Sequence, residues 1–531
     1  MKKLPLGIQS FRKMIDGGYV YVDKTQYVYD LIDNSSYYFL SRPRRFGKSL
    51  LLDTIAEAFS GDKELFKGLY IYDSGYPFEK HPVLRFDMSN VAGKTPDILE
   101  SELLIELRKR VRKEGLDIDY ATPSAMFKSL IEELHDKHNK RVVVLIDEYD
   151  KPILDQLENP EIAEANREVL RGFYGILKSM DSHLHFMLIT GVSKFTKTSV
   201  FSGLNNLFDI TMVKRYANIC GIPIEDLGRC FEAHIEDLAL SDGFAHIGDL
   251  YAEILAWYDG YSWDGKTRVI NPYSLLSFFA RKKFESFWYS SGTPTFLIGL
   301  IKNKPESFLA LRNLELRERV LDSFDVRKME IEPLLFQTGY LTVKEMRYFG
   351  VTESYLLKIP NLEVREAFYL NIIADFTERG EVFAETAYRK IKQSLDAGDL
   401  QGMLDILKSL FASIPHQLHI CAEAYYHSIF YAIMSLLGFD ADAEVSVSGG
   451  RIDATLELDD KVYVMEFKYV CCPRGATPEA KQGFFEKALD EGMAQMEAKG
   501  YAGKYAGCGK KVYQVAFAFL GRDDIRYRLV V

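Results

Sequence analysis

One stretch near the amino terminus, residues 38–52, constrains the fold of this chain more than any other. An apolar run of strand character leads into a basic turn, then into Gly47-Lys48-Ser49, and then into an apolar run of helical character. Such a turn aims backbone N–H groups at a polyphosphate, which also meets the positive end of the helix dipole. The pattern is typical of a phosphate-binding loop, in which Lys48 reaches the β and γ phosphates and the Ser49 hydroxyl binds Mg²⁺.

The loop departs from the usual G-x-x-x-x-G-K-[ST] pattern because Arg42 stands where the first glycine should be. The chain must therefore turn differently at this point. We expect Arg42, Arg44 and Arg45 to place cationic donors beside the phosphates and to compensate for poorer backbone geometry. The alternative is a basic surface turn that happens to precede a helix.

A second motif lies farther along the chain, where the unbroken apolar run 142–146 ends in Asp147 and Glu148. Continuous apolarity predicts a central parallel strand that is buried on both faces. We expect Asp147 to hold Mg²⁺, directly or through water, and Glu148 to orient or activate the attacking water. The alternative, a strand that simply ends in a polar turn, is weakened because both motifs converge on one ion.

Strand and helix signals alternate around these two motifs. Strands are predicted at 82–87 and 185–190, and helices at 48–59, 96–113 and 123–138. This alternation predicts a doubly wound parallel sheet with its ligand at the carboxyl ends of the strands. Thr190 and Ser193, at the tip of the last strand, are candidates to sense the γ-phosphate. The strand-like residues 19–25 either line an adenine pocket or cover the sheet edge.

The carboxyl-terminal part carries a different constellation. Residues 450–457 and 461–469 predict two strands of a hairpin. Alternate side chains of a strand share a face, so Glu466 and Lys468 point the same way and Asp453 on the partner strand can lie beside them. Two carboxylates for a divalent cation and an ammonium for a hydroxide nucleophile suffice for metal-assisted phosphodiester hydrolysis. A solvated strand face with alternating charges would show the same E-x-K spacing.

The quoted motifs together resemble a known family. The segments that carry the likeness are Tyr21-Val22-Asp23-Lys24-Thr25, Arg42 to Ser49, Leu145 to Asp150 and Thr190 to Phe195, and they resemble the AAA-ATPase-like family. Bacterial and archaeal members often carry a PD-(D/E)XK nuclease-like domain at the carboxyl end. The predicted succession of a helix with Glu423, the strand hairpin, a helix with Gln495 and a strand at 512–519 is similar to that domain.

The resemblance implies a role for each residue that matches the motifs. An arginine at position 42 of the loop is then a trait of the family, which favours nucleotide binding. Asp453 and Glu466 bind metal, Lys468 assists the nucleophile, Glu423 completes the metal shell and Gln495 contacts the scissile region. Ile452 replaces the proline of the motif name, which supplies no ligand.

The middle of the chain predicts mostly helices, with a two-stranded, winged-helix-like wing within 334–375 and a helical hairpin at 383–413 as the linker. Arg268 either reaches the nucleotide or pairs with Asp259 or Asp264. The predicted domains are an ATPase domain at 1–210, a helical lid at 211–400 and a restriction-endonuclease-like α/β domain at 401–531.

Composition excludes some classes of protein. The net charge of −10 argues against a globally basic coat for nucleic acid, although a local basic groove stays compatible with it. The six cysteines show no zinc spacing and indicate free thiols in a reducing cytosol. No apolar stretch is long enough to cross a bilayer, so we expect a cytoplasmic protein without a membrane partner. The resemblance implies that the protein is bacterial. Three histidine pairs, at 135 and 138, 183 and 185, and 416 and 419, lack a third ligand nearby in sequence and read as surface or capping residues.

The sequence thus predicts an ATPase coupled to a Mg²⁺-dependent nuclease-like domain, with ATP and Mg²⁺ as cofactors and DNA rather than RNA as the partner. A homo-oligomer is compatible with these features. The alternative is a nucleotide-dependent switch whose carboxyl-terminal domain binds nucleic acid or a partner without cutting. A weaker alternative is a small-molecule phosphotransferase.

Overall fold

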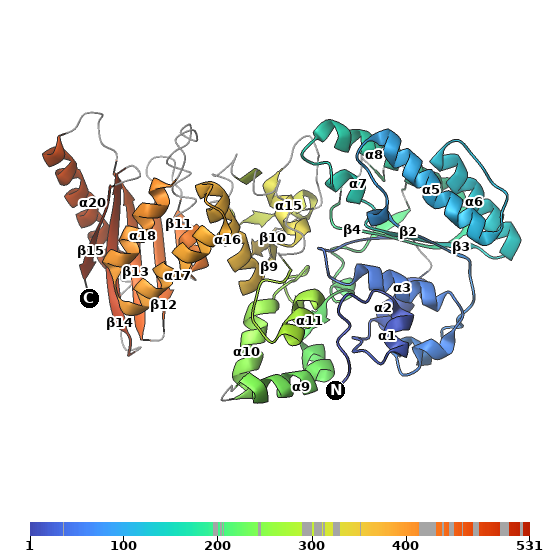
Figure 1. Cartoon of the computed structure of the whole chain (residues 1–531), viewed down its shortest axis with the longest axis horizontal. Helices are drawn as coiled ribbons and strands as arrows, with labels where there is room; N and C mark the ends of the chain where they lie inside the picture. Colours follow the sequence, from blue (N-terminus) through green and yellow to red (C-terminus); the bar gives the residue numbers. More distant parts are fainter. Residues whose placement is uncertain are drawn as a thin grey trace. The chain divides into compact units, whose positions relative to one another are not determined.

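The computed structural model describes the chain outside residues 35–36, 195–199, 202–203, 205, 243–245, 289–299, 302–310, 312–313, 322–329, 351, 414–431, 438–439, 445–450, 459, 471–476, 500–508, 521–523 and 531. It divides into two compact units (Figure 1). Unit 1 comprises Met1–Phe296 and Asn313–Val364, and unit 2 comprises Leu297–Arg312 and Arg365–Val531. The helical region predicted between the two modules thus lies largely in unit 1.

Unit 1 is organised around a parallel sheet with the strand order β2-β3-β4-β1-β5. Its strands are β1 (Tyr37–Ser41), β2 (Val83–Asp87), β3 (Val142–Asp147), β4 (Leu184–Gly191) and β5 (Leu207–Asp209). The strands predicted from the phosphate loop, the acidic motif and residues 82–87 and 185–190 are confirmed. The short edge strand β5 was not predicted, and residues 20–24 form no strand.

Helices cover both faces of this sheet. They are α1 (Phe11–Asp16), α2 (Thr25–Asp33), α3 (Lys48–Ala58), α4 (Tyr70–Asp73), α5 (Pro96–Glu114), α6 (Pro123–His138), α7 (Lys151–Leu154) and α8 (Pro160–Gly175), with short 3₁₀ helices η1 (Lys63–Phe66), η2 (Met88–Asn90), η3 (Ile176–His183) and η4 (Lys214–Tyr216). Figure 1 shows α5, α6 and α8 on one side of the sheet and α1, α2 and α3 on the other. The doubly wound α/β fold is therefore confirmed.

The ends of the long helices follow from local signals. Thr95 caps α5 by accepting a hydrogen bond from the Ile98 N–H, and the helix ends at Gly115 in the left-handed conformation. Thr122 caps α6 in the same way through the Ala125 N–H. Each helix has proline in its first turn, where no N–H partner is needed. The two helices were predicted within a residue of these bounds.

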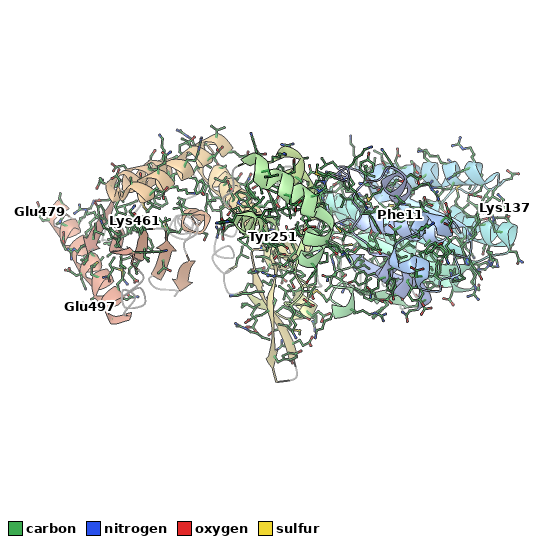
Figure 2. All side chains as sticks on the ribbon, turned by 90° about the horizontal axis from the view of Figure 1, so that it is seen from below. Phe11, Lys137, Tyr251, Lys461, Glu479 and Glu497 are labelled. Carbon is green, nitrogen blue, oxygen red and sulfur yellow. The ribbon has the colours of Figure 1, made fainter. Side chains whose placement is uncertain are left out.

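A second group of elements completes unit 1. These elements are β6 (Ile222–Pro223), α9 (Ile224–Asp242), α10 (Ile247–Tyr258), β7 (Val269–Ile270), α11 (Pro272–Arg281), β8 (Glu315–Leu316), α14 (Glu318–Leu321), α15 (Ile331–Thr338), β9 (Thr342–Phe349) and β10 (Thr352–Lys358). Helices α9, α10 and α11 share an apolar core that includes Leu227, Ile254 and Leu275. Tyr251 on α10, which is labelled in Figure 2, ties α10 to the start of α9 by donating its hydroxyl to the Ile224 carbonyl at 3.2 Å. The predicted wing is present as the antiparallel hairpin β9–β10, with β8 as a third strand.

Unit 2 contains a sheet with the order β11-β12-β13-β14-β15. Its elements are α16 (Leu362–Thr377, which begins in unit 1), α17 (Glu381–Ala397), α18 (Leu400–Ala412), β11 (Asp440–Glu444), β12 (Arg451–Glu457), β13 (Lys461–Tyr469), α20 (Pro478–Lys499), β14 (Lys511–Leu520) and β15 (Asp524–Val530). Strands β13 and β14 are parallel, and the other neighbours are antiparallel. The hairpin β12–β13 and strand β14 were predicted, whereas β11 and β15 were not.

The two faces of this sheet are covered by different helices. Val462 and Val464 of β13 belong to the apolar core that α20 closes. Tyr463, which points the opposite way, donates its hydroxyl to the Leu395 carbonyl of α17 at 2.7 Å. The hairpin α17–α18, which turns at Gly398 with a φ of 75°, is therefore built into unit 2 and is not a free linker. None of the described helices is long and apolar enough to cross a membrane.

Candidate active sites

The first candidate site is the phosphate loop between β1 and α3. Lys48 is buried, and its ammonium donates to the carbonyls of Arg42 at 2.8 Å and Pro43 at 2.9 Å. Gly47 has a φ of 92°, a conformation that favours glycine, and it is the N-cap residue of α3. Burial lowers the pKa of Lys48, while the nearby carboxylates of Asp147 and Glu148 oppose that shift. The loop thus folds back on its own lysine and holds that lysine close to the acids at the end of β3.

Arg42 is placed away from the position predicted for it. Its guanidinium is fully buried and donates to the carbonyls of Ser41 at 2.8 Å, Thr211 at 2.9 Å and Tyr216 at 3.1 Å. It also stacks on the ring of Trp263, 3.9 Å from the centroid. Burial lowers the pKa of Arg42 to about 10. Arg42 therefore anchors the base of the loop, and the structure does not bring it together with Arg44 and Arg45 as a phosphate donor.

Arg44 and Arg45 do face the cavity beside the loop. This cavity has a volume of about 390 Å³ and is lined by the loop residues from Arg44 to Ser49, by Glu148 and by the segment from Val20 to Val22. Its far wall comes from α9 and α11, through Phe231, Tyr273 and Leu276. Residues 20–22 and Lys24 thus line the cavity, and their role as an adenine pocket stays a prediction. Phe231 and Tyr273 were missed, because only the fold brings α9 and α11 to the loop.

The acidic motif at the end of β3 is held rigidly. Asp147 is buried, and its carboxylate accepts hydrogen bonds from the Thr190 hydroxyl at 2.7 Å and the Glu148 N–H at 3.1 Å. Glu148 has a φ of 50°, a conformation that is uncommon for a residue with a side chain and that turns its carboxyl toward the cavity. Burial raises the pKa of Glu148, and the charge of Lys48 opposes this. A carboxyl so placed suits the predicted role of a general base.

The strand tip next to this motif has a different role from the one expected. The Thr190 hydroxyl is engaged with Asp147, and the Ser193 hydroxyl donates to the buried carboxylate of Asp150 at 2.7 Å. Asp150 also accepts from the backbone N–H of Val192 and Ser193. Both hydroxyls therefore fix acids in place, and the structure shows neither in the cavity wall. Arg268 pairs with Asp259 at 3.5 Å, which confirms the local ion pair.

The second candidate site lies on the face of the unit 2 sheet beneath α20. Glu466 is fully buried on β13, and the ammonium of Lys468 lies 2.9 Å from its Oε1 atom. The same ammonium donates to Oε1 of Gln495 on α20 at 2.6 Å. Asp453 of β12 is in register with Glu466 on the neighbouring strand. The structure therefore brings Glu466, Lys468 and Gln495 together as predicted, and it places the backbone of Asp453 beside them.

The structure does not describe the side chains of two members of the predicted metal shell. The side chain of Asp453 and all of Glu423 lie outside the described residues. Among the side chains that are described, no three His, Cys, Asp or Glu residues gather as a metal site. The carboxylate of Glu466 is a hard oxygen donor, as are the Ser49 hydroxyl and the Asp147 carboxylate at the first site. Both sets fit a hard divalent cation such as Mg²⁺ by chemical type.

The remaining candidates behave as ordinary structural residues. His135 meets His183 edge to face at 4.9 Å, and His185 stacks on His81 at 4.0 Å. Burial lowers the pKa of His185 to about 4, so this ring is neutral near pH 7. His416 and His419 lie outside the described part of the chain. Cys220 and Cys230 are free thiols, as expected.

Comparison with known proteins identifies a family for each of the two regions that hold the sites. A family model described as predicted AAA-ATPase matches residues 5–201, and a model of the PD-(D/E)XK nuclease superfamily matches residues 421–528. An uncharacterized protein in the vnfD 5′ region of Azotobacter chroococcum mcd 1 is 38% identical over 530 residues, which cover 98% of this chain and 97% of the relative.

Solved structures give weaker similarities. The Aeropyrum pernix ORC2 protein, in ADPNP–ADP complexes, has a TM-score of 0.27 and 12% identity, covering 65% of this chain and 93% of that chain. Cdc6p from Pyrobaculum aerophilum has a TM-score of 0.23 and 9% identity, covering 68% of this chain and 98% of that chain.

The fold and the two sites define a protein that joins an ATPase-like domain to a nuclease-like domain. The chain belongs to the AAA-ATPase-like family, and its residues 421–528 match the PD-(D/E)XK nuclease superfamily.

Proposed function

We propose that this protein binds and hydrolyses ATP and cleaves DNA in a Mg²⁺-dependent reaction, with nucleotide state controlling cleavage. The observation that carries the proposal is the contact of Lys468 with both Glu466 and Gln495. Glu466 is in register with Asp453 on the neighbouring strand. A buried carboxylate beside a half-buried ammonium is costly to desolvate, which favours a functional role for the pair. The amide nitrogen of Gln495 is buried without a hydrogen-bond partner among the described residues, so it is available to an anionic oxygen.

The residues of the second site divide the work of phosphodiester hydrolysis. Asp453 and Glu466 would hold Mg²⁺, which supplies Lewis acidity at the scissile phosphate when bound. Lys468 stabilises negative charge on the attacking oxygen, because its ammonium lies on the same face of the sheet as the Glu466 carboxylate. Gln495 orients Lys468 through its oxygen and presents its N–H₂ group to the phosphate.

The residues of the first site divide the work of ATP hydrolysis in a comparable way. Ser49 and Asp147 would hold Mg²⁺, and Lys48 exchanges its carbonyl partners for phosphate oxygens. Arg44 and Arg45 flank the phosphates at the cavity wall. Glu148 accepts a proton from the attacking water, for which its raised pKa is suited.

The decisive experiment for the nuclease is cleavage of matched single-stranded DNA, double-stranded DNA and RNA in Mg²⁺. Lys468→Ala should abolish cleavage, whereas Lys461→Ala should keep it. Lys461 is a matched control because it lies on the same strand with a similar side-chain exposure, 13% against 14%, and donates to the Asp396 carbonyl. Undiminished cleavage by Lys468→Ala would overturn the assignment of the site.

The ATPase is tested separately by Lys48→Ala, with Lys151→Ala as its control. Lys151 lines the same cavity but pairs with Asp155. Lys48→Ala should lose nucleotide binding and turnover, and Lys151→Ala should retain both. Nucleotide-dependent DNA binding without cleavage by the wild type would overturn the nuclease and favour a switch protein.

A further inference from the structure

Glu363 is a buried carboxyl at the point where the chain passes from unit 1 to unit 2. It is the second residue of α16, its exposed fraction is 0%, and the division between the units follows Val364. Buried glutamates are rare unless they are paired with a cation or bind a ligand. A glutamate here therefore needs an explanation beyond packing.

The partners of Glu363 are neutral hydrogen-bond donors. Its Oε1 atom accepts from the backbone N–H of Trp288 at 2.7 Å and from the Ser274 hydroxyl at 2.9 Å. Its backbone carbonyl accepts from the Ser286 hydroxyl at 3.1 Å. The second carboxyl oxygen, Oε2, is buried and has no hydrogen-bond partner among the described residues. Glutamine could make the same two Oε1 contacts, so hydrogen bonding alone does not require a carboxyl.

Trp288 and Ser274, the two partners of the Glu363 carboxyl, connect it to the phosphate loop. The indole N–H of Trp288 donates to the Arg44 carbonyl at 3.2 Å. Ser274 follows Tyr273, whose ring lies 4.9 Å below the Arg45 guanidinium and lines the cavity. Two short routes therefore run from Glu363 to neighbouring residues of the loop.

The packing around these routes is tight enough to transmit a displacement. A Cβ atom on Gly339, which has a φ of 95°, would lie 2.8 Å from Cβ of Pro43 in the loop and 3.3 Å from the Trp288 ring. Trp288 also packs edge to face on Tyr340 at 5.2 Å. Packed elements of this kind move together, because interiors have few voids to absorb a shift.

The electrostatic setting of Glu363 follows from burial. Burial raises the pKa of Glu363 to about 7, and the hydrogen bonds from the Trp288 N–H and the Ser274 hydroxyl oppose the shift. The titratable group that faces it from the neighbouring turn is the phenol of Tyr261, whose pKa is raised by burial and then by the charge of Glu363. Tyr340 faces Tyr261 in turn. The protonation state of Glu363 thus changes within the physiological range.

We propose that Glu363 is a positioning residue of the nucleotide site, which links the conformation of the phosphate loop to the first turn of α16 through Trp288 and Ser274. The inference rests on the proposed binding of nucleotide at this loop. It adds a route by which the nucleotide site acts on the helix that leads into unit 2, and it makes that link dependent on the charge of one carboxyl.

The test measures the dissociation constant of Mg·ADP by calorimetry between pH 5.5 and pH 8.5 for wild type, Glu363→Gln and Glu366→Gln. The Mg·ADP dissociation constant should change between the two ends of this pH range in all three proteins. That change should be at least about threefold larger in wild type and in Glu366→Gln than in Glu363→Gln. Glu366 is the matched control because it lies on the same helix, and burial raises its pKa as well. The titration of the nucleotide itself is common to all three proteins and cancels.

A purely structural role would change stability but leave the three pH profiles parallel, and parallel profiles would overturn the proposal. Trp288→Phe provides a second test, because it removes the bond to the Arg44 carbonyl and keeps the backbone bond to Glu363. Its profile should lie between those of wild type and Glu363→Gln, because the route through Ser274 and Tyr273 remains. A wild-type profile in this variant would overturn the proposal too. Absence of nucleotide binding by the wild type would instead overturn the proposed function, and the inference with it.

Discussion

Restoring the missing glycine of the phosphate loop should damage this protein. The substitution Arg42→Gly gives the chain the usual loop pattern, yet it removes a guanidinium that binds three backbone carbonyls and stacks on Trp263. Those carbonyls come from β1 and from the residues after β5, so the arginine joins the loop to the strands beneath it. We expect lower stability of unit 1 and weaker nucleotide binding.

The size of the effect follows from the contacts. Hydrogen bonds to a charged group contribute about 1.5 kcal/mol or more each, and a desolvated cation on an aromatic ring contributes about 2 kcal/mol. Burying the guanidinium opposes these gains by about 3 kcal/mol, as its pKa of about 10 indicates. The net loss in the free energy of unfolding should be about 3 to 4 kcal/mol. Arg45→Gly is the matched control, because Arg45 is exposed and has a φ of 68°, which glycine adopts easily.

The assay is urea unfolding followed by tryptophan fluorescence. The three tryptophans of the chain are Trp257, Trp263 and Trp288, and all lie in unit 1, so the signal reports that unit alone. Arg42→Gly should lower the unfolding midpoint strongly, and Arg45→Gly should leave it near the wild-type value or raise it. If Arg42→Gly matches wild type in stability, or binds Mg·ATP more tightly, the anchoring role of Arg42 is refuted.

Three further predictions follow from particular contacts. The pKa of Glu363 is raised from 4.5 to about 7, so between these pH values the folded state binds a proton that the unfolded state has lost. The free energy of unfolding of wild type, measured in urea, should therefore fall relative to that of Glu363→Gln by up to about 3 kcal/mol as pH rises through this window. Gly492→Ala would place a Cβ atom 3.0 Å from that of Ala516, so we expect it to push α20 away from the sheet and to separate Gln495 from Lys468. DNA cleavage should slow more than tenfold. Gly483→Ala on the same helix, whose new Cβ atom meets nothing within 4 Å, should leave cleavage unchanged, and equal rates in the two variants would contradict this account. Glu148→Gln should keep Mg·ATP binding but reduce turnover by about 100-fold or more, as measured by phosphate release, and an unaffected rate would remove Glu148 from the mechanism.

Much of the fold could be predicted where the signals are local. Helices α5 and α6 were predicted almost to the residue, and their ends carry local signals: a threonine cap, proline in the first turn and a glycine or asparagine at the end. The hairpin β12–β13 was predicted with Asp453 beside Glu466, since strand periodicity and a short turn set the register. The edge strands β5, β11 and β15 were missed, because they are defined mainly by the strands they pair with.

The sequence by itself determined which residue types each site contains: Lys48 with Asp147 and Glu148 in one unit, and Glu466 with Lys468 and Gln495 in the other. The position of the acids at a strand end and the alternation of Glu466 and Lys468 along a strand predicted that these residues meet, whereas Gln495 followed only from the family resemblance. Only the tertiary structure decided what Arg42 does. A basic residue in a phosphate loop reads as a phosphate donor, but its partners Thr211, Tyr216 and Trp263 lie far along the chain, and only folding brings their carbonyls and ring around the guanidinium.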